Sequence, residues 1–136
     1  MDTIKKDNEN AKNILVVEDE KPLQDAIRIK LEKGGFSVVT ARTVEQAWGL
    51  LEDIGDIAVV WLDHYLLGKE NGLDLVVKIK HSEKFKTIPV FVVSNTATQD
   101  KVKCYIALGV SNYYTKSNYR LDQIIKDINE YLAKHK

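Results

Sequence analysis

This sequence has little cysteine and little proline, and it has no surplus of charge of one sign. A single cysteine, Cys104, among 136 residues excludes an internal disulfide and favours a reducing compartment such as the cytoplasm. The 20 basic and 20 acidic residues balance, so the chain lacks the basic surface typical of nucleic-acid-binding proteins. No apolar run approaches the roughly 20 residues of a membrane-spanning helix, and the polar N-terminal residues do not resemble a signal peptide. We therefore expect a cytoplasmic protein whose partners are neither nucleic acid nor membrane.

The length and the distribution of apolar residues predict one folded domain. Residues 1–12 are polar and charged with almost nothing to bury, so we expect a flexible N-terminal tail. Residues 13–134 are long enough to form a self-sufficient hydrophobic core. Cys104 falls within a predicted helix of this domain, where we expect it to be a small packing residue.

Strand and helix patterns alternate five times along the domain. Continuous apolar runs predict strands that are buried on both faces, which is typical of parallel sheets. The predicted strands are 13–17, 36–41, 57–62, 90–93 and 110–114, and the predicted helices are 21–33, 44–53, 72–82, 99–108 and 119–133. This alternation predicts an α/β fold: a single-domain, doubly wound, five-stranded parallel sheet with helices on both faces, (βα)5.

Polar residues suited to phosphate or metal chemistry follow the apolar strands. They are Glu18 and Asp19, Asp63, Ser94 and Lys116. Because the carboxyl ends of parallel strands meet at one edge of the sheet, we expect these side chains to converge. Three carboxylates in one place repel each other, and a hard cation such as Mg²⁺ would relieve that repulsion.

Each of these residues also has an ordinary structural interpretation when taken alone. Glu18 and Asp19 could simply favour the start of a helix through capping and the helix dipole. His64, next to Asp63, is interpreted as an exposed loop histidine without a function. Trp48 and Trp61 are interpreted as packing residues. It is the combination at the strand ends that favours a functional site.

Four segments of the chain resemble the receiver domain of two-component response regulators, which has the CheY-like or flavodoxin-like fold. The resemblance covers about residues 13–133 and rests on four motifs in the order and spacing of that family. They are Ile-Leu-Val-Val-Glu18-Asp19-Glu, Val-Val-Trp-Leu-Asp63-His-Tyr-Leu, Pro89-Val-Phe-Val-Val-Ser94 and Ala107-Leu-Gly109-Val-Ser-Asn-Tyr113-Tyr-Thr-Lys116.

The resemblance implies a phosphoacceptor and a metal site. Asp63 would be the phosphorylated residue. Asp19 and Asp63 would bind Mg²⁺ (or Mn²⁺) directly, together with the main-chain oxygen of Tyr65, and Glu18 would act mainly through water.

The resemblance also implies how a phosphoryl group would be bound and sensed. Lys116 would pair with Asp63 at rest and with a phosphoryl oxygen after phosphorylation, and the main-chain nitrogen of Asn95 would bind the same group. Ser94 and Tyr113 would form the switch, in which the hydroxyl moves to the phosphoryl group and the aromatic ring turns inward.

We therefore predict a phosphorylation-controlled signalling module rather than an enzyme acting on an outside substrate. A sensor histidine kinase or a histidine phosphotransfer protein would supply the phosphoryl group. A downstream protein would bind through residues 99–134, and the chain would be a monomer or a weak dimer. Two alternatives stay open: a shuttle that passes the group onward in a multistep relay, and a receiver-like binding module that works without phosphorylation. A metal-dependent phosphatase is disfavoured, because Tyr65 stands where such enzymes commonly have a second acid.

The chain departs from the family's usual pattern around this site. Ser117 follows the lysine where the family usually has proline, often after a cis bond. Because serine lacks the tertiary amide that makes a cis bond inexpensive, we predict a trans Lys116–Ser117 bond. Leu67, Asn95 and the position of Gly72 also differ from the commonest pattern.

Overall fold

A computed structural model describes residues 11–95 and 98–135. Its strands are β1 (Asn13–Val17), β2 (Ser37–Ala41), β3 (Ile57–Leu62), β4 (Val90–Ser94) and β5 (Asn112–Thr115). Its helices are α2 (Lys21–Lys33), α3 (Val44–Ile54), α4 (Gly72–Lys80), α5 (Gln99–Leu108) and α6 (Leu121–Lys134), with a 3-10 turn, η1, at Lys116–Asn118. The tail expected at residues 1–12 falls almost entirely outside the described residues.

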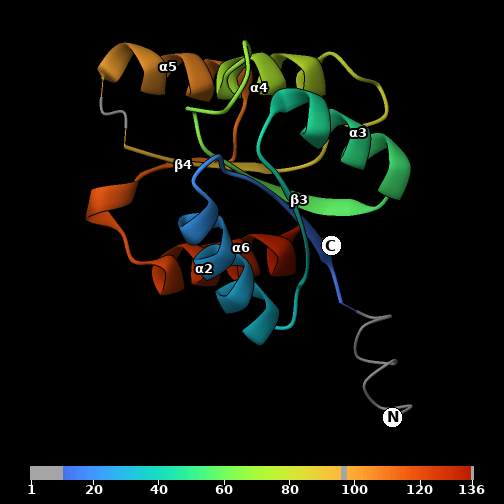
Figure 1. Cartoon of the computed structure of the whole chain (residues 1–136), viewed down its shortest axis with the longest axis vertical. Helices are drawn as coiled ribbons and strands as arrows, with labels where there is room; N and C mark the ends of the chain where they lie inside the picture. The colour runs from blue at the N-terminus through green and yellow to red at the C-terminus, as the bar shows by residue number, and fades with distance from the viewer. Residues whose placement is uncertain (1–10, 96–97, 136) are drawn as a thin grey trace.

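The strands form one parallel sheet in the order β2-β1-β3-β4-β5. Helices α3, α4 and α5 cover one face, and α2 and α6 cover the other (Figure 1). This arrangement confirms the predicted doubly wound α/β fold. It also places β1, β3 and β4, whose ends carry the predicted site, next to one another.

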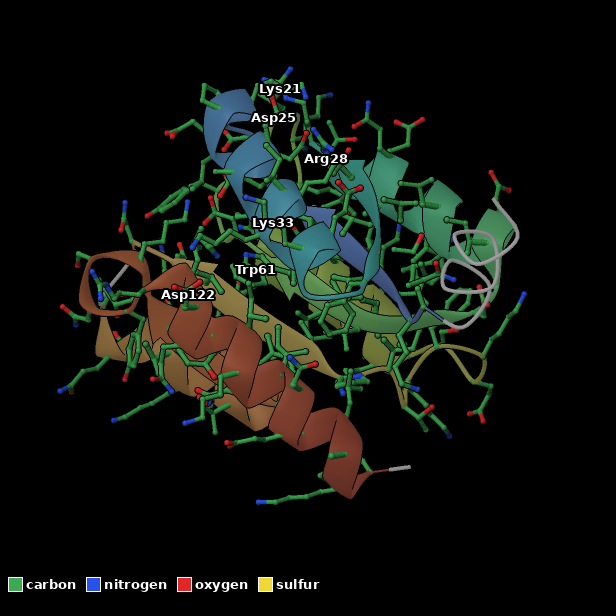
Figure 2. All side chains as sticks on the ribbon, turned by 90° about the horizontal axis from the view of Figure 1, so that it is seen from below. Lys21, Asp25, Arg28, Lys33, Trp61 and Asp122 are labelled. Carbon is green, nitrogen blue, oxygen red and sulfur yellow. The ribbon has the colours of Figure 1, made fainter. Side chains whose placement is uncertain are left out.

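The central strands β1, β3 and β4 are apolar except for a polar residue at one end of β1 and of β4, because both faces of the sheet are covered there, whereas the edge strands β2 and β5 contain polar residues and are less buried. Successive side chains of a strand point to opposite faces. Leu15 and Val17 accordingly lie in the core under α3 and α4, while Ile14 and Val16 lie in the core under α2 and α6. Figure 2 looks onto the second face, where the labelled Trp61 lies at the level of the sheet between α2 and α6.

Both tryptophans are packing residues, as predicted. Trp61 is buried in the core beneath α2 and α6. Trp48, on α3, is partly buried and packs edge-to-face against Phe85, with ring centroids 5.4 Å apart.

The ends of several elements differ from the prediction. β5 starts at Asn112 rather than residue 110, because the Val110 amide donates to the Tyr105 carbonyl and so completes the turn that ends α5. Residues 116–118 form η1, and α6 therefore begins at Leu121 rather than at residue 119. Helix α4 ends at Lys80, two residues before the predicted end.

The prediction that Cys104 packs in the interior is wrong. Cys104 is exposed on α5, and the residue beside it, Tyr105, is the one fully buried residue of that helix.

Among the residues that the structure describes, no helix is both long and apolar enough to cross a membrane.

Candidate functional site

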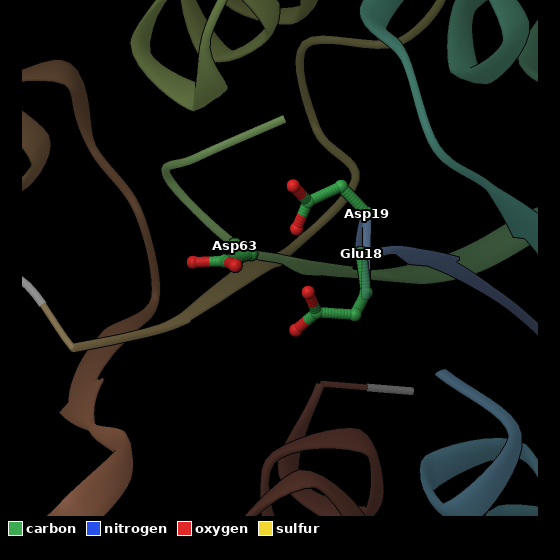
Figure 3. Close-up of side chains that lie close together, drawn as sticks. All are labelled: Glu18, Asp19 and Asp63. Carbon is green, nitrogen blue, oxygen red and sulfur yellow. The ribbon is translucent and has the colours of Figure 1, made fainter. Parts of the chain in front are cut away.

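Two strand ends place the three carboxylates together. The main chain continues the sheet for one residue beyond each strand: the Glu18 amide donates to Ala41 O at 3.0 Å, and the Asp63 amide donates to Val17 O at 2.9 Å. The side chains of Glu18, Asp19 and Asp63 gather at this edge (Figure 3). Glu18 is 1% exposed and Asp63 4% exposed, whereas Asp19 is half-buried. The sequence prediction that these residues converge is therefore confirmed.

The carboxylates are close enough to share a cation. One oxygen from each of Glu18, Asp19 and Asp63 lies within 4.8 Å of the other two. Asp63 Oδ1 is buried and has no hydrogen-bond partner among the described residues. A buried carboxylate oxygen without a donor is unfavourable unless something positive binds it. The residues present therefore fit a hard divalent cation, which prefers oxygen ligands.

Lys116 supplies the positive charge that the protein itself brings to the site. Its Nζ donates to Glu18 Oε1 at 2.8 Å and to Asp63 Oδ2 at 3.1 Å. The pairing with Asp63 was expected, but the shorter contact with Glu18 was not. Among the described residues there is no cis peptide bond, so the Lys116–Ser117 bond is trans, as predicted.

Burial works against the charge of the buried glutamate. Burial raises the pKa of Glu18 to about 7, and the nearby Asp63 charge adds to the effect, while the hydrogen bond from Lys116 opposes it. Burial alone would lower the pKa of Lys116. Its hydrogen bond to Glu18 and the charge of Asp63 outweigh burial and raise that pKa above its usual value. Lys116 therefore stays protonated beside the carboxylates at neutral pH.

Two supporting residues were missed by the sequence reasoning. The Arg42 guanidinium donates to the main-chain oxygen of Asp19 from Nη2 at 2.7 Å and from Nε at 3.0 Å. Buried Gln24 donates from Nε2 to Glu18 O at 3.0 Å and to Ala41 O at 3.1 Å. The signal for Gln24 was available, because it lies at helical spacing from the apolar Ile27 and Leu31.

The predicted switch residues are in contact. Ser94, the last residue of β4, is fully buried, and its side chain shares a hydrogen bond with the Tyr113 hydroxyl. Asn95 is exposed at the rim, where it lines a pocket with Tyr65, Glu20, Lys116 and the three carboxylates. Six of the residues predicted for the site therefore line one pocket, and Ser94 directly precedes one of them, Asn95.

The interpretation of His64 as an exposed loop residue is wrong. His64 is 3% exposed, and its ring Nδ1 lies 2.7 Å from the hydroxyl of the fully buried Tyr105. Burial is also the main cause that lowers the pKa of His64. Sequence reasoning missed the pair because the two residues are far apart along the chain and each is unremarkable alone.

Comparison with known proteins decides the family. The family model described as "Response regulator receiver domain" matches residues 14–129. The chain belongs to this family. Chemotaxis protein CheY1 of Helicobacter pylori (strain ATCC 700392 / 26695) is 31% identical over 104 residues, which is 76% of this chain and 83% of that protein.

Solved receiver structures agree with this assignment. The phosphorylated cyanobacterial phytochrome response regulator RcpA is 30% identical, with a TM-score of 0.78 over 89% of this chain and 93% of that one. The Mn²⁺-bound form of the response regulator Rcp1 is 26% identical, with a TM-score of 0.76 over 89% of this chain and 94% of that one. This receiver domain is thus a signalling module of the two-component type rather than an enzyme of the ordinary kind.

Proposed function

We propose that Asp63 accepts a phosphoryl group from the phosphohistidine of a sensor histidine kinase or a histidine phosphotransfer protein. One observation carries this proposal: Asp63 presents a buried oxygen without a donor among the described residues, while Lys116 binds its other oxygen. An Asp63 oxygen attacks phosphorus, the bond from phosphorus to the imidazole nitrogen breaks, and the imidazole leaves with that electron pair and takes up a proton. The product is an acyl phosphate on Asp63.

The surrounding residues fit this reaction. Asp19 and Asp63, the main-chain oxygen of Tyr65 and, through water, Glu18 would hold Mg²⁺ (or Mn²⁺). When bound, that ion would neutralise part of the negative charge on the phosphoryl oxygens. Lys116 contributes a second positive charge from the protein and moves from Asp63 Oδ2 to a phosphoryl oxygen. The main-chain nitrogen of Asn95 donates to the same group.

The switch follows from the hydrogen bond between Ser94 and Tyr113. When the Ser94 hydroxyl turns to the phosphoryl group, its hydrogen bond with Tyr113 breaks. The Tyr113 ring can then move into the space that the hydroxyl vacates. Ser94 opens the loop to α5, and Tyr113 lies on β5, so the change reaches residues 99–134. A downstream protein would read this surface in the cytoplasm, with residues 13–134 acting as the functional unit, as a monomer or weak dimer.

Intact-mass measurement after incubation with acetyl phosphate and Mg²⁺ tests the phosphoacceptor. The wild type should gain one phosphoryl group, and Asp63→Asn should gain none. Asp122→Asn, which removes an exposed carboxylate on α6, should be labelled like the wild type. Equal labelling of Asp63→Asn would refute the assignment.

A transfer assay separates terminal output from relay. Phosphorylated protein is mixed with a candidate histidine phosphotransfer protein, and both chains are weighed. Loss of the group to water alone supports output, and its arrival on the partner's histidine supports the shuttle function.

A further inference from the structure

Helix α5 contacts the loop after β3 at two consecutive residues. Lys101 and Tyr105 are four residues apart on α5 and therefore lie on the same side of the helix. Lys101 Nζ lies 3.2 Å from the Tyr65 hydroxyl and 5.0 Å from the centroid of its ring. Tyr105 reaches the preceding residue, His64. One side of α5 thus contacts the two residues that directly follow Asp63.

The two contacts differ in their surroundings. Tyr65 is 52% exposed, so water and salt weaken its contact with Lys101. His64 and Tyr105 are both buried, and their 2.7 Å hydrogen bond is shielded from water. Tyr105 is also the one fully buried residue of α5. Tyr105 is therefore the most deeply buried contact of this helix with the core, beside the partly buried Leu108.

Gly72 allows the Tyr105 hydroxyl to reach His64. The Gly72 amide donates to His64 O at 2.8 Å, which brings the start of α4 against the loop. A Cβ at Gly72 would lie 2.5 Å from the Tyr105 hydroxyl oxygen and 3.0 Å from His64 Cα. Glycine is the only residue without a Cβ, so any other residue at position 72 would block the contact between Tyr105 and His64.

Tyr105 also contacts the residue expected to act in the switch. The rings of Tyr105 and Tyr113 lie 5.7 Å apart between centroids, and Tyr113 shares a hydrogen bond with Ser94. Tyr105 is thus in contact with His64 on one side and with Tyr113 on the other. A displacement of either neighbour changes the surroundings of Tyr105.

We propose that the Tyr105 hydroxyl is a positioning group that ties α5 to His64, so that a change at Asp63 reaches α5 through His64 as well as through Ser94 and Tyr113. The proposal rests on phosphorylation of Asp63, the function proposed above. The competing interpretation is that Tyr105 only fills space, and that its hydroxyl serves only as a hydrogen-bond partner for the ring nitrogen of His64. The two interpretations differ in what happens when the hydroxyl alone is removed.

The test compares two tyrosine-to-phenylalanine variants by amide chemical shifts. Tyr105→Phe removes the hydroxyl that contacts His64. Tyr114→Phe is the matched control, because Tyr114 is equally buried, and its hydroxyl donates to Asp127 Oδ2 at 2.7 Å on the other face of the sheet. Spectra are recorded with Mg²⁺, with and without beryllofluoride, which mimics a phosphoryl group on an aspartate.

In the wild type and in Tyr114→Phe, we expect beryllofluoride to shift amides around Asp63 and along residues 99–108. In Tyr105→Phe, the shifts around Asp63 should persist, and those along 99–108 should fall by about twofold or more. Undiminished shifts along α5 in Tyr105→Phe would overturn the inference. If the wild type does not respond anywhere, the proposed function fails instead, so the two failures are distinguishable.

A second pair of variants covers the case in which Tyr105→Phe does not fold. His64→Asn keeps a polar group near the position of Nδ1, whereas His64→Leu removes it. The asparagine variant should retain the response of α5, and the leucine variant should lose it; an equal response in both would overturn the inference. In metal-free protein without beryllofluoride, α5 amides should exchange hydrogen roughly fivefold faster in His64→Leu than in His64→Asn, as expected for loss of one hydrogen bond.

Discussion

The body of β1 and the residues that follow it contrast sharply. Ile14, Leu15, Val16 and Val17 are each fully buried among apolar side chains. Glu18, the next residue, is just as buried but carries a carboxylate beside that of Asp63. In the strand, local preference and tertiary packing agree. At its end, burial opposes the ionised form of the side chain, and Lys116 offsets only part of that cost. Stability and function are thus assigned to adjacent residues, and substitutions in the two regions should have effects of opposite sign.

The largest effect is expected in the body of the strand. Leu15→Ala removes a fully buried side chain from the core under α3 and α4 and leaves a cavity there. We expect the free energy of unfolding to fall by about 2–5 kcal/mol. Urea denaturation followed by circular dichroism measures it. A loss below about 1 kcal/mol would show that this part of the core can rearrange to fill the space.

The next effect lies where the strand end meets α4. In Gly72→Ala, the new Cβ would lie 2.5 Å from the Tyr105 hydroxyl and 2.8 Å from the main-chain oxygen of Asp63. We expect a loss of about 1–3 kcal/mol, as for other overpacked sites. Gly49→Ala is the matched control, because nothing lies within 4 Å of a Cβ at Gly49 in the middle of α3. Alanine there should raise the free energy of unfolding by about 0.5–1 kcal/mol. If both variants changed stability alike, the close packing at Gly72 would be refuted.

The smallest effect, of opposite sign, is expected at the acidic edge. In EDTA, Asp19→Asn should raise the free energy of unfolding by about 1 kcal/mol, because it removes one of three mutually repelling carboxylates. Mg²⁺ should then stabilise the variant much less than the wild type, since bound metal stabilises the fold by mass action. Thermal unfolding with and without Mg²⁺ measures both effects.

The control for this edge is Glu45→Gln, which removes an exposed acid from the first turn of α3. It should lower stability slightly, because an acid there interacts favourably with the helix dipole. Its response to Mg²⁺ should match that of the wild type. An Asp19→Asn variant that Mg²⁺ stabilises as strongly as the wild type would contradict the metal assignment.

The sequence alone was sufficient for the sheet and for the residues at its edge. Continuous apolar runs identified the central strands β1, β3 and β4, because burial on both faces leaves no room for polar alternation. The rule that parallel strands end at one edge then brought Glu18, Asp19, Asp63, Ser94 and Lys116 together. These inferences worked because each depends on a local pattern and on one general property of parallel sheets.

Contacts between distant side chains could not be predicted in this way. The bond between His64 and Tyr105 depends on how closely α5 approaches the loop after β3, and no local pattern encodes that distance. The exposure of Cys104 depends on how α5 is rotated about its axis. The helix turns Tyr105, not Cys104, toward the core. The two arginine bonds to the Asp19 main chain likewise depend on the exact direction of the Arg42 side chain.

The central position of β3 has a mechanical consequence. β3 is paired with β1 on one side and β4 on the other, and the Asp63 amide extends the pairing with β1 by one more hydrogen bond. The main chain at Asp63 is therefore firmly held, and a chemical change there is not readily absorbed by moving the strand. Any movement has to occur in parts with fewer restraints: the connecting loops, the edge strand β5 and the sparsely buried helix α5. The stiffness of the middle of the sheet thus determines which parts of the molecule are able to report on Asp63.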